Sequence, residues 1–133
     1  MKDKQIRVLL SNEYTCIIEF RKYETYNNIL ATWIQIHIAK RSAKKRYFKN
    51  KVNNMYHYGG GTLQDITKIA IVVKDYLNKE QPKYIVISAY PDLKYKQREC
   101  IYSQFMKKNE YVFMFYDKDE NGCKTSAMVY KKL

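Results

Sequence analysis

The amino-terminal part of the chain alternates hydrophobic and polar residues with a period of two. The alternation is cleanest in 30–39, where three isoleucines share one side and Trp33, Gln35 and His37 share the other. A period of two predicts a strand with one buried face. We therefore expect His37 to be a surface residue beside Trp33, without a catalytic partner. Two shorter runs, 6–10 and 14–21, predict a hairpin that precedes this strand.

The pattern changes to a helical period after Thr62. Thr62 and Asp65 have the spacing of a helix cap, and hydrophobic residues then recur three and four positions apart. The predicted buried stripe consists of Ile66, Ile69, Ala70, Val73, Tyr76 and Leu77. The run 84–90 that follows is almost entirely hydrophobic, which indicates a central strand buried on both faces.

A second helix is predicted over 93–108, because Pro91-Asp92 turns the chain and supplies a cap. Its expected buried stripe is Tyr95, Arg98, Ile101, Tyr102 and Phe105. Strands are predicted at 111–116 and 125–131, joined by a tight turn at 119–122 that contains Asn-Gly. Weaker patterns predict a helical turn or a long loop at 41–50 and a further strand at 52–58.

The order of these elements predicts an α+β fold, with a mixed, largely antiparallel sheet and two principal helices. At 133 residues, the length predicts a single domain over 1–133. Three dispersed cysteines and two histidines favour a reducing compartment over a disulfide framework or a metal site. Met1–Gln5 is polar and no hydrophobic run is long enough for a membrane span, so we expect a cytoplasmic protein.

Positive charge is concentrated in one stretch of a chain whose net charge is +12. No acidic residue occurs between Glu24 and Asp65, whereas Lys40–Lys51 reads KRSAKKRYFKNK. Such a cluster favours an anionic partner: nucleic acid, a nucleotide-bearing cofactor or an acidic protein. A solvated basic loop is the alternative. The residues expected to contact nucleic acid or an acidic partner are Lys40, Arg41, Lys44, Lys45, Arg46, Tyr47 and Lys49, with Tyr47 available for stacking.

A triple glycine stands immediately before the first predicted helix. Gly59, Gly60 and Gly61 let the backbone approach a ligand, and the helix that begins near Thr62 offers unpaired N–H groups and partial positive charge to a phosphate. The stretch lacks both the P-loop and the Rossmann spacing. The alternative is a flexible turn.

Two motifs in 52–133 resemble the GNAT-type N-acetyltransferases. Tyr56-His57-Tyr58-Gly59-Gly60-Gly61 resembles the family's glycine-rich pyrophosphate loop, with Tyr56 in place of the usual Gln or Arg. Ile101-Tyr102-Ser103-Gln104-Phe105 resembles the end of the family's second helix. The resemblance implies that acetyl-CoA binds through Gly59–Thr62 and that Tyr102 protonates the departing thiolate. A tyrosine at this helical spacing can instead be an ordinary core residue. The base is not identified, and His57 is the candidate, acting directly or through a water molecule.

The amino-terminal half departs from that family. The family usually has helices between its first two strands that shape the acceptor pocket, and residues 11–13 leave no room for them. An active N-acyltransferase and a catalytically degenerate acyl-CoA-binding protein therefore both remain open. The compact Lys- and Tyr-rich chain also resembles small phage-encoded proteins. The alternative function is a non-enzymatic module that binds nucleic acid or an acidic protein through 40–51.

Overall fold

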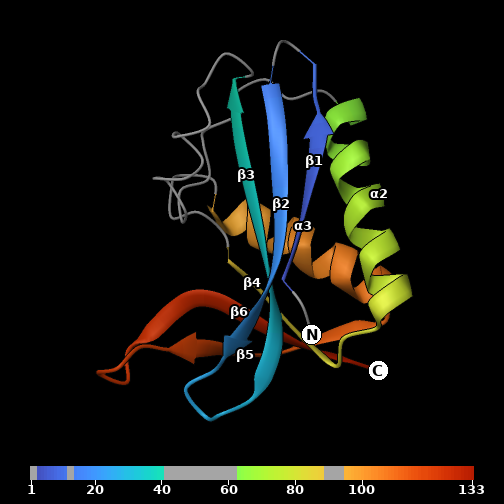
Figure 1. The fold of residues 1–133 in the computed structure, drawn as a ribbon. Coiled ribbons are helices and arrows are strands. Elements are labelled where there is room, and N and C mark those ends of the chain that lie inside the picture. Colours follow the sequence, from blue (N-terminus) through green and yellow to red (C-terminus); the bar gives the residue numbers. More distant parts are fainter. Residues whose placement is uncertain (1–2, 12–13, 41–62, 89–94) are drawn as a thin grey trace.

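A computed structural model describes residues 3–11, 14–40, 63–88 and 95–133 (Figure 1). The fold is α+β, as predicted: six strands form one sheet, and two helices pack against it within the described residues. In chain order the elements are β1 (Lys4–Leu9), β2 (Tyr14–Glu24), β3 (Leu30–Lys40), α2 (Leu63–Glu80), β4 (Tyr84–Ser88), α3 (Tyr95–Lys108), β5 (Tyr111–Lys118) and β6 (Lys124–Lys132). The strands predicted at 6–10, 14–21 and 125–131 are confirmed with shifted ends, and the strand predicted at 52–58 lies outside the described residues.

The strands lie in the order β1-β2-β3-β4-β6-β5. Every neighbouring pair is antiparallel except β3 and β4, which are parallel. A parallel pair needs a crossover connection, and α2 lies in the segment between these two strands. The parallel pairing spans only Thr32–Ile34 of β3, although β3 continues to Lys40.

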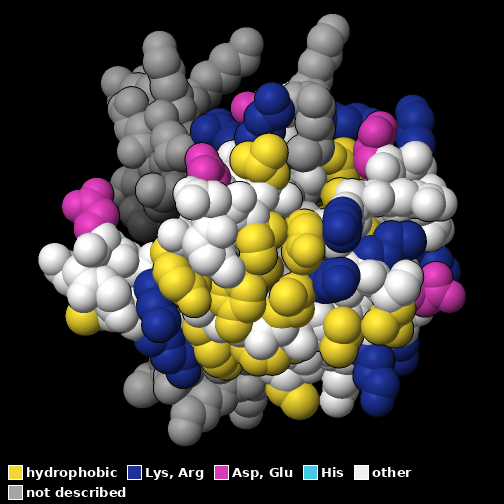
Figure 2. Space-filling view, turned by 90° about the horizontal axis from the view of Figure 1, so that it is seen from below, with side chains coloured by type: hydrophobic (Ala, Val, Ile, Leu, Met, Phe, Trp, Pro, Cys, Tyr) yellow, Lys and Arg dark blue, Asp and Glu magenta, His cyan; other side chains and the backbone are white. Residues whose placement is uncertain are grey.

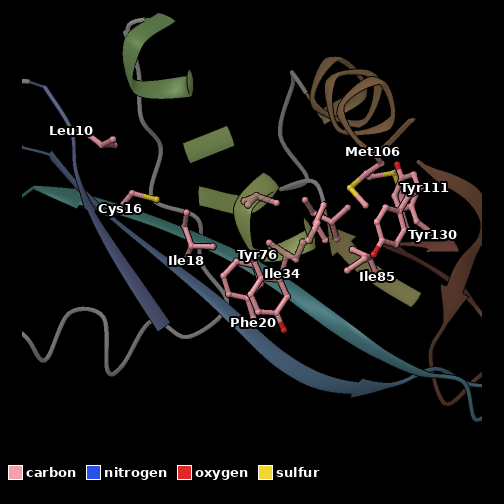
Figure 3. Packing of buried hydrophobic residues seen from close by; sticks show 14 residues of the cluster. Leu10, Cys16, Ile18, Phe20, Ile34, Tyr76, Ile85, Met106, Tyr111 and Tyr130 are labelled. Atoms are coloured by element: carbon pink, nitrogen blue, oxygen red, sulfur yellow. Dashed lines mark hydrogen bonds between the residues drawn. The ribbon is translucent and has the colours of Figure 1, made fainter. Parts of the chain in front are cut away.

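One face of the sheet, called here the helix face, packs against α2 and α3 and contains the main hydrophobic core (Figure 3). Phe20 of β2 stacks on Tyr76 of α2 with ring centroids 3.7 Å apart, and Met106 brings α3 onto the same face. The hydroxyls of Ser103 and Tyr130 are 2.7 Å apart, which fixes α3 to β6. The two helices and all the inner strands therefore share one core.

Two positions of the predicted helix stripes are wrong. Ile101 is 57% exposed, while Met106, absent from the predicted stripe, is completely buried. Tyr102, Phe105 and Met106 have i, i+3, i+4 spacing and form the row that contacts the core, which leaves Ile101 on the solvent side of α3. In α2, Ile66 is also exposed, and Asp65 is buried beside it.

The opposite face, called here the second face, carries a smaller hydrophobic cluster. Ala31, Val86, Ala127 and Val129 are buried there, and Trp33, Tyr23, Tyr84 and Phe115 pack around them. The prediction that β3 buries only one face is therefore wrong, because Gln35 and His37 on the second face are also buried.

The sheet is curled strongly enough for β2 to contact β5 across the second face, although β3, β4 and β6 separate the two strands in the sheet order. The Tyr23 hydroxyl of β2 donates a hydrogen bond to the Asp117 carboxylate of β5. The N–H of Tyr26 donates to the same carboxylate at 3.0 Å, and the Tyr26 ring meets Phe115 edge to face. Asp117 is buried, and these donors compensate for its lost hydration.

The turn predicted at 119–122 joins β5 to β6, as expected. Gly122 adopts a positive φ of 78°, which is the conformation that favours glycine. The Asp119 carboxylate accepts the N–H groups of Asn121 and Cys123, both at 2.9 Å. The side chain of Asp119 therefore closes the turn in the way typical of an Asx motif.

Candidate functional site

Most of the residues predicted to carry function lie outside the described residues. These are Arg41, Lys44, Lys45, Arg46, Tyr47, Lys49, His57, Gly59, Gly60, Gly61 and Thr62. Their roles remain predictions. Lys40 is described only as the last residue of β3, without its side chain.

Tyr102 is the one predicted catalytic residue whose surroundings are described. It is half-buried on α3 and packs against the main core on the helix face. Core contact of this kind is ordinary for a tyrosine on an amphipathic helix. Its partial exposure leaves the predicted role as an acid open to experiment.

The carboxyl ends of β3 and β4 lie at the same end of the parallel pair, and α2 begins after β3 at that same end (Figure 1). β4 is the neighbour of β3 on one side, and from Ile36 onward β3 has no pairing partner on that side among the described strands. Ligands in sheets with parallel strands bind beyond the carboxyl ends of the strands, and a helix amino end attracts anions. The start of α2 and the carboxyl ends of the parallel strands both lie at this end of the sheet, with the start of α2 beside the turn between β1 and β2.

A carboxylate already occupies the first turn of α2. Asp65 is 2% exposed and accepts hydrogen bonds from the N–H of Ser11 at 3.0 Å and from its hydroxyl at 2.5 Å. The interaction fastens the turn between β1 and β2 to the start of α2. Because Asp65 is negative and close to the helix end, it opposes the attraction of any other anion to that end.

A buried polar cluster on the second face was not predicted from the sequence. His37 is not a surface residue: it is 6% exposed, and its Nε2 lies 3.0 Å from Oε1 of Glu19 on the neighbouring strand. The two atoms are at ion-pair distance but are not aligned as a hydrogen bond. The other Glu19 oxygen accepts Nε of Arg21 at 3.0 Å and Nη2 at 2.5 Å. Glu19 thus bridges a half-exposed guanidinium and a buried imidazole.

This cluster has the composition of a proton-accepting site. A carboxylate beside an imidazole stabilises the positive charge that the ring gains when it accepts a proton. The Arg21 guanidinium fixes the position of the Glu19 carboxylate and partly compensates its negative charge. The arrangement can therefore orient a histidine base, provided that a substrate reaches the ring.

A signal for this cluster was present in the sequence. Glu19 is the only charged residue within the otherwise uncharged run 14–20, and a carboxylate in such a run requires a partner. In the β2–β3 register, Glu19 faces Gln35 and Ile17 faces His37, so Glu19 and His37 are diagonal neighbours. The register could not be derived from the pattern alone, because it depends on the length of the turn after Glu24.

The described residues contain no group of three or more His, Cys, Asp or Glu side chains arranged to hold a metal ion. None of the described helices is long and hydrophobic enough to span a membrane. The three cysteines are free thiols: Cys16 is buried, and Cys100 and Cys123 are exposed.

Comparison with known proteins finds no matching family model, curated protein or solved structure.

Proposed function

We propose that this chain binds an acyl-CoA at the carboxyl end of the parallel strands and transfers the acyl group to an amine. The observation that carries the proposal is the short parallel pair. β3 and β4 pair over three residues only, and β3 then continues beside no described strand on that side, at the end where α2 begins.

An edge of this kind suits the chemistry of coenzyme A. The pantetheine arm contains two amide groups, which can hydrogen-bond to a strand edge as an added strand does. The pyrophosphate would lie against the amino end of α2 and the preceding glycines. The element order resembles the N-acetyltransferase core over 52–133, and the strand order with one parallel pair supports that resemblance.

The proposed reaction joins the amine nitrogen to the thioester carbonyl carbon and breaks the carbon–sulfur bond. The proton lost by the amine passes to His37, and the departing thiolate takes a proton from Tyr102. Tyr102 packs on the helix face and His37 lies on the second face. One substrate would have to reach both residues beside the part of β3 that has no described partner on the β4 side, and His37 lies three residues, or about 10 Å, past Ile34 along that strand.

His37 is a better candidate for the base than His57, because a carboxylate partner, Glu19, is identified for His37. His57 lies outside the described residues and has no carboxylate in 52–58. We therefore assign proton acceptance to His37, with Glu19 as its positioning residue.

The experiment measures thiol release from acetyl-CoA with a panel of polyamines, amino sugars and peptide amines, using the wild type and His37→Gln. The wild type should release thiol with at least one amine of the panel, and His37→Gln should lower that rate about 100-fold. Lys22→Gln, an exposed change on β2, serves as the control. A wild-type rate in His37→Gln would exclude His37 as the base, whereas a wild type that releases no thiol with any of the amines would contradict the proposed reaction.

A further inference from the structure

Among the described strands, β5 forms an edge of the sheet that is hydrophobic and uncharged over most of its length. β5 is the last strand in the sheet order, and residues 111–116 carry no charge. Val112, Phe113 and Met114 are 46%, 40% and 41% exposed. β5 lies on the lower side of the molecule in Figure 1, and Figure 2 shows hydrophobic side chains gathered on that side with Lys and Arg around them.

The other free edge is protected in a way that β5 is not. β1 carries two exposed positive charges, Lys4 and Arg7, in a strand of six residues. Charges on an edge strand discourage pairing with another chain, and an uncharged hydrophobic edge invites it. The two edges of this sheet therefore differ, and β5 is the edge that can accept a strand.

A bulge explains why three successive residues of β5 are exposed. Phe113 pairs with Tyr130 and Phe115 with Val129, so Met114 is the extra residue and the usual alternation fails there. Before the bulge the ladder is regular, and the N–H of Leu133 donates to the carbonyl of Glu110 at 2.8 Å. The alternation of an antiparallel ladder then directs the N–H and C=O groups of Tyr111 and Phe113 to the free edge.

The charges at the two ends of β5 select an orientation. Glu110 precedes the strand and Lys118 ends it, both are exposed, and neither has an ion-pair partner among the described residues. An antiparallel arrangement of two copies brings each Glu110 toward the partner's Lys118, whereas a parallel arrangement brings like charges together. We propose that β5 pairs antiparallel with β5 of a second copy, forming a two-fold dimer with one sheet continuous across both chains.

The charge distribution favours a second copy over an acidic partner. The chain as a whole is strongly positive, but the stretch 110–119 contains three acidic residues, Glu110, Asp117 and Asp119, and a single lysine, Lys118. An acidic peptide would gain little at this edge, while a copy of the same strand supplies complementary ends. Dissolved salt screens charges over about 8 Å, which weakens the repulsion between the remaining positive charges of the two copies.

The first test is the mass in solution by size exclusion with light scattering, over concentrations up to the near-millimolar range. The wild type should approach twice the monomer mass, and Met114→Lys should weaken the dimer at least tenfold. Ile71→Lys is the matched control, because Ile71 is an exposed hydrophobic residue on α2. A wild type that is monomeric throughout overturns the proposal, as does a dimer that both variants weaken equally.

The second test addresses the orientation. Glu110→Lys should weaken the dimer, and the double variant Glu110→Lys, Lys118→Glu should restore it, because the two ends then carry exchanged charges. Glu80→Lys on α2 gives the same change in net charge away from the strand. Thermal melting establishes that each variant is folded. A double variant that is as weak as Glu110→Lys contradicts the antiparallel arrangement.

Discussion

At the scale of single residues, burial in the core raises the pKa values of one cysteine thiol and three tyrosine hydroxyls. Burial raises the pKa of the Cys16 thiol to about 12, from an ordinary value of 9.0. Burial, and secondarily the charge of Tyr76, raises the pKa of Tyr111 to about 12, from 10.0. Burial also raises the pKa values of Tyr23 and Tyr76, and the Asp117 carboxylate adds to the effect at Tyr23. Ionisation of these groups therefore costs more free energy in the folded protein than in the unfolded chain.

These raised pKa values predict a loss of stability at alkaline pH. A neutral acid whose pKa is higher in the folded state stabilises fully below its unfolded pKa, and this contribution is lost as the pH rises toward the folded pKa. The free energy of unfolding should thus fall between about pH 9 and about pH 12. Urea denaturation across this range measures it. In Tyr111→Phe, the alkaline loss should be smaller than in the wild type.

Tyr111→Phe also removes a hydrogen bond. The Tyr111 hydroxyl donates to the carbonyl of Pro82 at 2.5 Å, and phenylalanine leaves that carbonyl without this donor. A cost of about 1–2 kcal/mol is expected at neutral pH. An identical pH dependence in the two proteins would show that Tyr111 does not titrate as described.

From the sequence, the face of a strand on which each residue lies was predicted better than the side chains that each residue contacts. The alternation correctly placed His37 on the opposite face of β3 from the isoleucines. The expectation that this face is exposed to solvent is wrong, because His37 is buried. A pattern along one strand contains no information on what covers a sheet face. Glu19 and His37 become neighbours only through the register of two strands.

At the scale of elements, turn chemistry was the most reliable signal. The Asn-Gly turn predicted the β5–β6 hairpin, and strand and helix types were correct throughout the described residues. The ends of the strands were predicted less accurately than their positions. For example, β2 extends to Glu24 because it pairs with β3, although the residues after Arg21 do not themselves favour a strand. The stripe of α3 was misplaced at Ile101, because hydrophobic spacing alone did not decide between two adjacent rows.

Gly122 provides a test of the hairpin. A Cβ at this position would meet no atom within 4 Å, so the cost of Gly122→Ala comes from its positive φ alone. We expect Gly122→Ala to lower the unfolding free energy by about 1 kcal/mol. Gly122→Asn should lose less, because asparagine adopts this conformation more readily. Equal losses in the two variants, measured by denaturation, would contradict this explanation.

Asp65 links the packing of α2 to the proposed ligand. Asp65→Asn retains an acceptor for Ser11 but removes a negative charge from the first turn. We expect stability to fall by about 1 kcal/mol and the affinity for acetyl-CoA to rise about three- to tenfold. Titration calorimetry on both proteins measures the ratio. Unchanged affinity would mean that the ligand phosphates bind away from α2.

At the scale of the whole molecule, the sheet combines one short parallel pair with a continuous helix-face core and a curled second face. The α+β class and the mixed sheet were predictable, because the order of strands and helices constrains the connections. The curl that joins Tyr23 to Asp117 was not, since it depends on the accumulated twist of six strands. The basic stretch 40–51 and the glycines at 59–61 remain predictions, because they lie outside the described residues.

The most direct test of the acyl-CoA proposal is calorimetric titration of the folded protein with acetyl-CoA. Saturable binding is predicted for the wild type. Gly60→Asp, which adds a carboxylate beside the expected pyrophosphate, should abolish binding, and Gly122→Asn, a glycine change in the turn between β5 and β6, should retain it. Absence of binding at millimolar acetyl-CoA, in a protein shown to be folded by thermal melting, would contradict the proposed function.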